Sequence, residues 1–462
     1  MRTGVHLTQL SHEDGGAIAK MARWVAGLEA ADIPAEVRGI ALTCLIDTLG
    51  VIAAGSATQV AAHARAVAGM SAGIGPCAIV GTDQRCDLRR AAFANGVAAH
   101  ALDFDDNCYA GFVHGSAVIA PAALAAAQHV DAGGAQLITA VVAGAECEYA
   151  LGLASANVLY DQGWWTTGVL GPVGACAAAA KLLRLDAAQT AQALGLAVAG
   201  AAGVKACFGT DGKAFLAGRA AEAGVTAALM AQAGASGPVD AFEHRNGFVR
   251  LFNGGQFHPQ AFDALGRNWA LLDPGVDVKR IPVCLSSHAA VDVALELVRE
   301  HDIALDEIAA ISCNVPPIVI ANLIHDDPAT PQQAQFSMPF AVAAALLYGK
   351  LELEHLSPEV LADAQLRALM AKVSMCSGPV WEDEAYRAAA PEGAELSIAL
   401  HDGHVLQGFR DFARGAARYP LTLSEIDDKF NACLRYAQLR LPSLSAALRA
   451  LETRGSVRGL FG

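Results

Sequence analysis

The chain changes character once along its length, and this change limits the folds that it can adopt. Up to about residue 275 it is rich in Ala and Gly and has few runs typical of strands. Small side chains allow helix axes to approach closely, so this part predicts a tightly packed helical body. We expect one helix to start after Asp32, its N-cap, with Pro34 in the first turn. Further helices are expected at residues 136–153, 168–182 and 214–234.

Beyond residue 275 the pattern is mixed. Residues 308–315 and 395–400 carry β-branched or alternating apolar side chains, which favour strands. The Asp402-Gly403 pair joins the second run to residues 404–409, a combination typical of a β-hairpin. Helical patterns are expected at residues 289–300, 336–347 and 423–451.

These patterns predict a mainly α fold. We expect a large all-helical domain formed by residues 1–274 and 409–462, with a smaller α+β domain, residues 275–408, inserted in it. The length of 462 residues also favours two hydrophobic cores over one.

The charge pattern argues against nucleic acid as a partner. The net charge is −14, and no cluster of Lys and Arg is long enough to follow a phosphate backbone. A small anionic ligand would therefore have to be bound by individual cations placed at its site.

Composition favours a cytoplasmic protein. Hydrophobic residues make up 54% of the chain, but the best candidate membrane span, residues 187–204, is Ala-rich and interrupted by Gln and Gly. We expect a buried helix there and no membrane segment. The charged residues near the N-terminus do not resemble a signal peptide. The 11 cysteines include no CxxC pair, which is typical of reduced, buried thiols rather than of disulfides or a metal site.

The densest group of reactive side chains lies at residues 100–116. His100, Asp103, Asp105 and Asp106 are followed, after an uncharged loop, by His114 and Ser116. Residues 117–128 look helical, so His114 and Ser116 should lie at a helix N-terminus. That end of a helix carries free N–H groups and partial positive charge, which suits a carboxylate ligand.

This block and three later ones resemble the MmgE/PrpD family, in the same order and spacing over nearly the whole chain. The later blocks are Phe208 to Gly224, Phe242 to Phe248, and Lys279 to Ala290. The family includes 2-methylcitrate dehydratase, cis-aconitate decarboxylase and iminodisuccinate epimerase. The resemblance implies a large helical domain with a smaller α+β domain, a site in the cleft between them, a homodimer, and no metal or organic cofactor.

The family's reactions make or quench a carbanion beside a carboxylate, which requires a base, a proton donor and cations. By resemblance, Asp103 is a base or a group that orients one, and His114 is an acid or a base. Lys213 would neutralise a substrate carboxylate or an enolate-like oxygen. We expect either Asp105 or Asp106 to be structural, because adjacent carboxylates raise each other's pKa.

The remaining candidate residues would contact the substrate. His288, which follows Ser286 and Ser287, could reach the cleft from the smaller domain, and Cys284 is more typical of a buried thiol than of a nucleophile. Three further positions depart from the family pattern: Asn107 where threonine is common, Trp165 where a histidine is frequent, and Phe340 where some members have tyrosine. These changes predict a more apolar, less cationic pocket, and hence a substrate with fewer carboxylates or with an apolar group that stacks on Trp165.

We therefore expect a cofactor-independent lyase that dehydrates a hydroxylated carboxylic acid. An epimerase of the iminodisuccinate kind is a second possibility, although racemisation needs two proton relays. A cis-aconitate-type decarboxylase is a third. A binding protein that keeps the fold without catalysis is a fourth, and the presence of Asp103, His114 and Lys213 argues against it.

Overall fold

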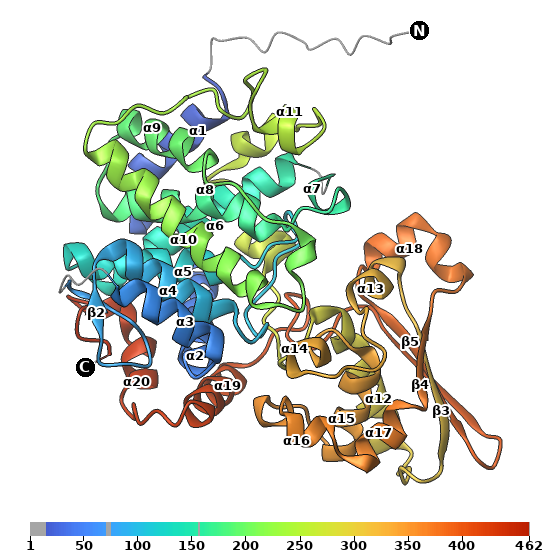
Figure 1. Ribbon diagram of the computed structural model, residues 1–462. Coiled ribbons are helices and arrows are strands. Elements are labelled where there is room, and N and C mark those ends of the chain that lie inside the picture. Colours follow the sequence, from blue (N-terminus) through green and yellow to red (C-terminus); the bar gives the residue numbers. More distant parts are fainter. Residues whose placement is uncertain (1–14, 71–74, 156–157, 462) are drawn as a thin grey trace, which may run out of the picture.

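The computed structural model describes residues 15–70, 75–155 and 158–461. It is mainly helical and contains two principal hydrophobic cores (Figure 1). The first core, which we call the helical body, takes its buried residues from 17–278 and from 426–460. The second core lies within residues 281–413, which we call the small domain.

The helical body is built almost entirely from helices. They are α1 (Ala17–Gly27), α2 (Ala35–Gly55), α3 (Gln59–Gly69), α4 (Leu88–His100), α5 (Gly115–Val130), α6 (Gly134–Ala154), α7 (Val158–Asp161), α8 (Thr166–Leu182), α9 (Ala187–Val198), α10 (Asp211–Gln232), α11 (Phe248–Phe252), α19 (Leu423–Tyr436) and α20 (Leu444–Arg449). Two short strands, β1 (Cys77–Ala78) and β2 (Arg85–Cys86), pair antiparallel.

Glycines let the central helices of this body pack closely. A Cβ atom on Gly224 of α10 would lie 2.6 Å from the carbonyl oxygen of Pro172 in α8. Helices α5 and α6 pack against α8 as well, and α19 packs on α2. The close approach predicted from the Ala and Gly content is therefore present at the α8–α10 contact.

The small domain contains a four-stranded sheet with helices packed on it. Its elements are α12 (His288–Glu300), β3 (Ile308–Asn314), α13 (Pro317–Asn322), α14 (Pro331–Ala334), α15 (Met338–Tyr348), α16 (Pro358–Leu361), α17 (Ala364–Met370), β4 (Val373–Cys376), α18 (Glu384–Ala389), β5 (Ala394–Leu400) and β6 (Val405–Arg410). The strand order is β4-β3-β5-β6, with β3 and β4 parallel and the other pairs antiparallel. Helices α12 and α15 contact the sheet and each other (Figure 1).

Most predicted elements are confirmed, two are corrected and one strand was missed. Asp32 does not cap α2: it ends a 3₁₀ turn, and the N-cap is Pro34, with an extended ψ of 145°, so the helix starts two residues later than predicted. The C-terminal helical stretch is divided into α19 and α20. Strand β4 was not predicted, because four residues are too few for an alternating pattern to be visible.

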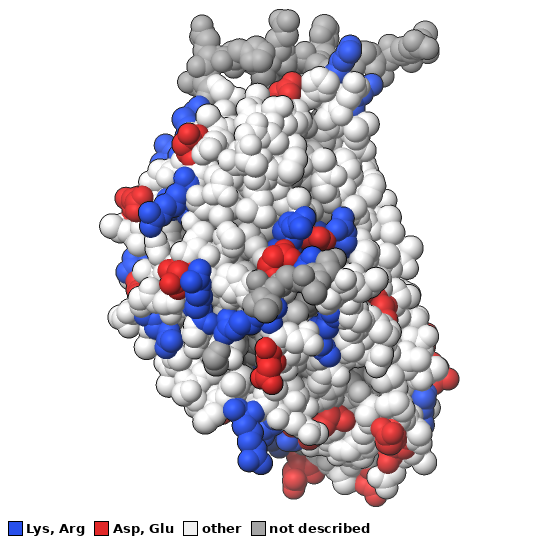
Figure 2. All heavy atoms as spheres, turned by 60° about the vertical axis from the view of Figure 1, so that its left-hand side comes forward, with Lys and Arg blue, Asp and Glu red and all other residues white. Residues whose placement is uncertain are grey.

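The apolar helices are interior elements. The uncharged residues 187–204 form only the 12-residue α9 and the turn after it. By length and composition α2 and α6 could span a membrane, but 72% and 94% of their most apolar windows are buried in the fold. On the face drawn in Figure 2, Lys and Arg lie among Asp and Glu, with broad uncharged areas between them.

Candidate functional site

The loop between α4 and α5 carries most of the candidate residues. His100 is the last residue of α4, and His114 is the N-cap of α5. Asp103 has a φ of 48°, in the left-handed region that non-glycine residues seldom adopt. Asn107 forms two backbone hydrogen bonds of 2.9 and 2.8 Å with Asp277, which fixes the loop beside the segment leading to the small domain.

Asp103 is the centre of a buried ion-pair network. Its Oδ1 atom lies 2.5 Å from Nζ of Lys213, and its Oδ2 lies 2.9 Å from Nζ of Lys279. The Lys279 ammonium also donates to the backbone carbonyl of Asp103, at 2.7 Å. Burial alone would raise the pKa of Asp103, but the two ammonium groups outweigh it and hold this pKa far below its usual range. Asp103 is therefore ionised at neutral pH.

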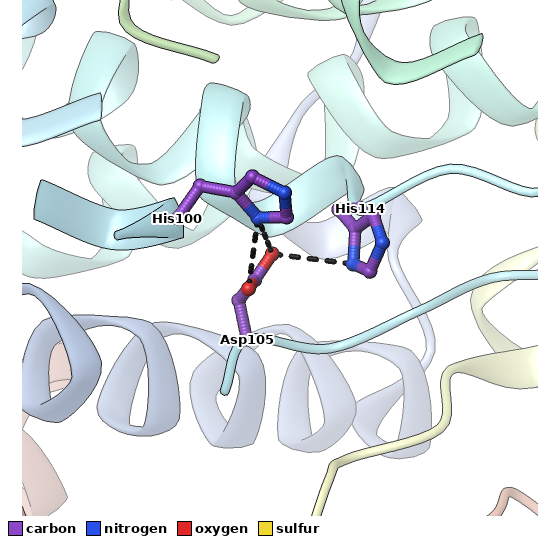
Figure 3. Close-up of side chains that lie close together, drawn as sticks. All are labelled: His100, Asp105 and His114. Atoms are coloured by element: carbon purple, nitrogen blue, oxygen red, sulfur yellow. Dashed lines mark hydrogen bonds and ion pairs between the residues drawn. The ribbon is translucent and has the colours of Figure 1, made fainter. Parts of the chain in front are cut away.

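Asp105 accepts hydrogen bonds from two imidazoles (Figure 3). Nδ1 of His100 lies 2.8 Å from Oδ2 of Asp105, and Nδ1 of His114 lies 3.3 Å from the same oxygen. The latter nitrogen is also 2.9 Å from the carbonyl oxygen of Asp106. Both Nδ1 atoms face acceptors only, so this network assigns a proton to each Nδ1, and in the neutral form of either ring the lone pair is then on Nε2.

The two histidines differ in access. His100 is fully buried, and burial lowers its pKa to about 4 despite the Asp105 carboxylate beside it, so its ring is neutral. Its Nε2 has no hydrogen-bond partner among the described residues. The His114 side chain is 14% exposed and lines the cavity described below. Of the two, His114 is the imidazole that a ligand can reach.

Asp106 is structural, as one of the two neighbouring carboxylates was predicted to be. It lies behind the loop, where it accepts hydrogen bonds from the hydroxyl and the backbone N–H of Ser116. Burial, with Asp47 and Asp105 nearby, raises its pKa to about 7. It does not line the cavity.

These groups border a cavity of about 50 Å³ between the helical body and the small domain. Its walls carry two lysines, two carboxylates, one imidazole and several aromatic rings. The lining residues are Asp103, Asn107, Phe112, His114, Tyr160, Trp165, Phe208, Lys213, Lys279, Cys284, Leu285, Asn322, Phe336 and Glu392. A larger hollow of about 220 Å³ also borders Asp103, Lys213 and Phe336, so the two hollows share part of their walls.

The structure brings together five of the nine residues selected from the sequence. Those that line the cavity are Asp103, Asn107, His114, Trp165 and Lys213. Ser286 is adjacent, because its hydroxyl donates to the cavity residue Glu392.

The other three face elsewhere. Ser287 donates its hydroxyl to the carbonyl of Cys284. His288 is buried, with Nε2 3.2 Å from the carbonyl oxygen of Val283, and burial lowers its pKa well below the usual range. Phe340 lies in the core of the small domain. As the first residue of α12, His288 is directed inward by the packing of that helix, which a sequence motif does not reveal.

Sequence reasoning missed several lining residues. Lys279 belongs to the family block Lys279 to Ala290. To predict its ion pair with Asp103, one would have to know that two residues 176 positions apart in the sequence are in contact. Glu392, Asn322 and Tyr160 belong to no motif. Single carboxylate, amide and aromatic side chains outside a motif are too common in a sequence for position alone to select them.

A metal would compete with existing hydrogen bonds. His100, Asp105 and His114 offer ligand atoms that all lie within 4.8 Å of one another (Figure 3). The Nδ1 atoms of both histidines already contact the Asp105 carboxylate, and these contacts satisfy the buried Asp105 without an ion. The geometry fits a carboxylate that orients two imidazoles.

Comparison with known proteins gives matches along most of the chain. Models of the MmgE/PrpD N-terminal and C-terminal domains match residues 19–260 and 281–441. A cis-aconitate decarboxylase-like protein, oryM, of Aspergillus oryzae is 26% identical, over 98% of this chain and 98% of its own length. The cis-aconitate decarboxylase of Homo sapiens is 28% identical, over 84% of this chain and 81% of its own. That of Aspergillus terreus is 26% identical, over 63% and 62%.

Proposed function

The chain belongs to the MmgE/PrpD family, and we propose that it is a lyase that dehydrates a small hydroxylated carboxylic acid. Family membership and the decarboxylase relatives support an enzyme of the lyase class. The proposed chemistry of proton transfer beside a carboxylate rests on one observation. An imidazole whose Nε2 is free to accept a proton borders the same small cavity as two ammonium groups.

In this proposal His114 is the base. Its Nε2 removes a proton from the carbon next to the substrate carboxylate, while Asp105 and the Asp106 carbonyl hold the ring through Nδ1. Charge then develops on the carboxylate oxygens, where Lys213 and Lys279 stabilise it. The C–O bond to the β-hydroxyl breaks, a carbon–carbon double bond forms, and the proton on His114 leaves with the hydroxide as water.

Asp103 has a positioning role in this scheme. A carboxylate held between two ammonium groups, with a strongly lowered pKa, is a poor base at neutral pH. It is better suited to keep both lysines charged and fixed at the cavity wall. Of the two sequence-based hypotheses for Asp103, we therefore propose the second, a group that orients the catalytic machinery.

Decarboxylation is the second candidate, favoured by the names of the relatives. Aromatic side chains around the cavity, including Phe112 and Trp165, would also destabilise a leaving carboxylate. In that reaction a protonated His114 would donate to the carbanion left by CO₂, with the same lysines stabilising it. Trp165 lines the cavity at the position where a histidine is frequent in the family, and the loss of that imidazole places this reaction second.

A panel of acids separates the two reactions. Malate, 3-hydroxybutanoate, citrate, 2-methylcitrate and cis-aconitate would each be followed by proton NMR for new vinyl or allylic signals of an alkene and, in parallel, for released CO₂. We expect a hydroxy acid to give an alkene without gas. Release of CO₂ from cis-aconitate at a higher kcat/KM than any dehydration would contradict the proposal and favour the decarboxylase.

A further inference from the structure

Glu392 is a cavity residue that the mechanism above does not use. It reaches the cavity from the small domain, just before β5. Its Oε2 accepts a hydrogen bond of 2.7 Å from the Tyr109 hydroxyl, and its Oε1 accepts one from Ser286. Both oxygens are acceptors, which is the pattern of an ionised carboxylate.

Neighbouring side chains from both domains fix the position of Glu392. Ser286 also accepts a hydrogen bond of 3.1 Å from the amide of Asn322, and the Tyr160 hydroxyl donates to the other end of that amide at 2.8 Å. Tyr109 and Tyr160 belong to the helical body, while the other members belong to the small domain. The carboxylate is therefore held at the cavity wall by contacts across the domain boundary.

Glu392 has no counter-ion in the described part of the chain: within residues 15–70, 75–155 and 158–461, no Lys, Arg or His forms an ion pair with it. Lys213 and Lys279, which line the same cavity, both pair with Asp103 instead. A partly buried carboxylate is stabilised most by groups that donate hydrogen bonds to it, and its two oxygens have lone pairs left to accept them.

The charges on the cavity wall are balanced but separated. Asp103 and Glu392 carry two negative charges, and Lys213 and Lys279 carry two positive charges. Among the side chains that line the cavity, the two lysines share the one carboxylate of Asp103, whereas the Glu392 side has one negative charge without a lysine partner. The ionised Asp105 next to His114 also acts on Lys279, so the positive charge on the lysine side is smaller than one full unit. A single substrate carboxylate fits the first side, whereas a second carboxylate would meet a like charge at the other.

We propose that Glu392 determines substrate specificity, selecting a monocarboxylate that carries a hydrogen-bond donor, such as a hydroxyl, over di- and tricarboxylates. This inference rests on the proposed function, because it assumes that the substrate carboxylate binds at Lys213 and Lys279. The sequence predicted a substrate with fewer carboxylates, and this inference names Glu392 as the residue responsible.

A matched pair of ligands tests it. 3-Hydroxybutanoate and malate differ only by a methyl group in place of a carboxylate, and their dissociation constants can be measured by titration calorimetry. We expect the unaltered protein to bind 3-hydroxybutanoate more tightly. Glu392→Gln should reduce that preference by about tenfold or more, because it removes the like charge that malate meets.

Two variants control for folding and for net charge. Glu392→Asp keeps the charge and should keep the preference for 3-hydroxybutanoate. Glu359→Gln removes an exposed carboxylate on α16 and should leave the ratio unchanged. Tighter binding of malate by the unaltered protein, binding of neither acid, or an equal ratio in Glu392→Gln would each overturn the inference.

The same measurements separate this inference from the proposed function. Turnover of the acids is followed separately by NMR, so a shifted ratio without dehydration of any acid would support the role of Glu392 and contradict the lyase reaction. Dehydration of a hydroxy acid, together with an unchanged ratio, would support the reaction and overturn the role of Glu392.

Discussion

Three charged side chains that are far apart in the sequence are buried together at the candidate site. The burial of each charge is stabilised by the opposite charge beside it. Lys213, Lys279 and Asp103 are at most 7% exposed. A buried charge that loses its partner is strongly destabilising, whereas an exposed pair contributes little. The geometry thus makes Asp103 as important for folding as for chemistry.

This dependence predicts a large loss of stability for Asp103→Asn. We expect the free energy of unfolding to fall by about 3–5 kcal/mol, because two ammonium groups would share no carboxylate. Asp263→Asn, which breaks the exposed pair with Lys20, should change it by about 1 kcal/mol or less. Urea unfolding measures both, and equal losses would contradict the ion-pair account.

The buried side chain of Glu148 should make the free energy of unfolding depend on pH. It is buried in α6, neither of its oxygens has a hydrogen-bond partner among the described residues, and burial raises its pKa to about 8. Between pH ~4.5 and 8 the folded protein keeps a proton that the unfolded chain releases, so stability falls as pH rises. Glu148→Gln should remove this slope, by at most ~1.4 kcal/mol per pH unit.

The test is urea unfolding of Glu148→Gln and of the unaltered protein at pH 5, 6, 7 and 8. We expect the free energy of unfolding of Glu148→Gln, relative to that of the unaltered protein, to rise with each increase in pH. Glu359→Gln, an exposed site, should show a constant difference. A constant difference for Glu148→Gln too would mean that the side chain is ionised in the fold.

At the scale of elements, glycine sets how closely α8 and α10 approach. A Cβ on Gly224 would lie 2.6 Å from both the Cys176 nitrogen and the Pro172 carbonyl oxygen, and backbone atoms cannot move aside easily. Gly224→Ala should therefore destabilise the protein by about 1–3 kcal/mol. Gly39 in α2 has no atom within 4 Å of such a Cβ, so Gly39→Ala should stabilise by about 0.5–1 kcal/mol. Thermal unfolding compares them, and the same sign for both would contradict the packing account.

Long periodic elements were predictable, and short ones were not. The sequence patterns locate α6, α8, α10 and the β5–β6 hairpin to within a few residues. Strand β4 has only four residues, and its pairing with β3 forms through tertiary contact rather than local pattern. The start of α2 was misplaced because Asp32 and Pro34, two positions apart, are both residue types that are common at a helix start.

At the scale of the whole molecule, the candidate site is a cavity that is lined by residues of both the helical body and the small domain. The loop after α4 and the start of α10 could be selected from the sequence, because they carry clustered charges in family blocks. Lys279 and Glu392 could not be assigned, because their partners Asp103 and Tyr109 are 176 and 283 positions away. Domain boundaries at residues 275 and 408, a homodimer and a cytoplasmic location remain predictions from the sequence.

Solvent hydrogen exchange tests the central claim most directly, that His114 and the two lysines share one bound carboxylic acid. A hydroxy acid turned over in the panel would be incubated in heavy water, and deuterium at the carbon beside its carboxylate would be followed by NMR. We expect exchange or elimination with the unaltered protein and a rate lower by about 10²–10⁴ for His114→Gln. Undiminished exchange in His114→Gln would contradict the account, because another group would then be taking the proton.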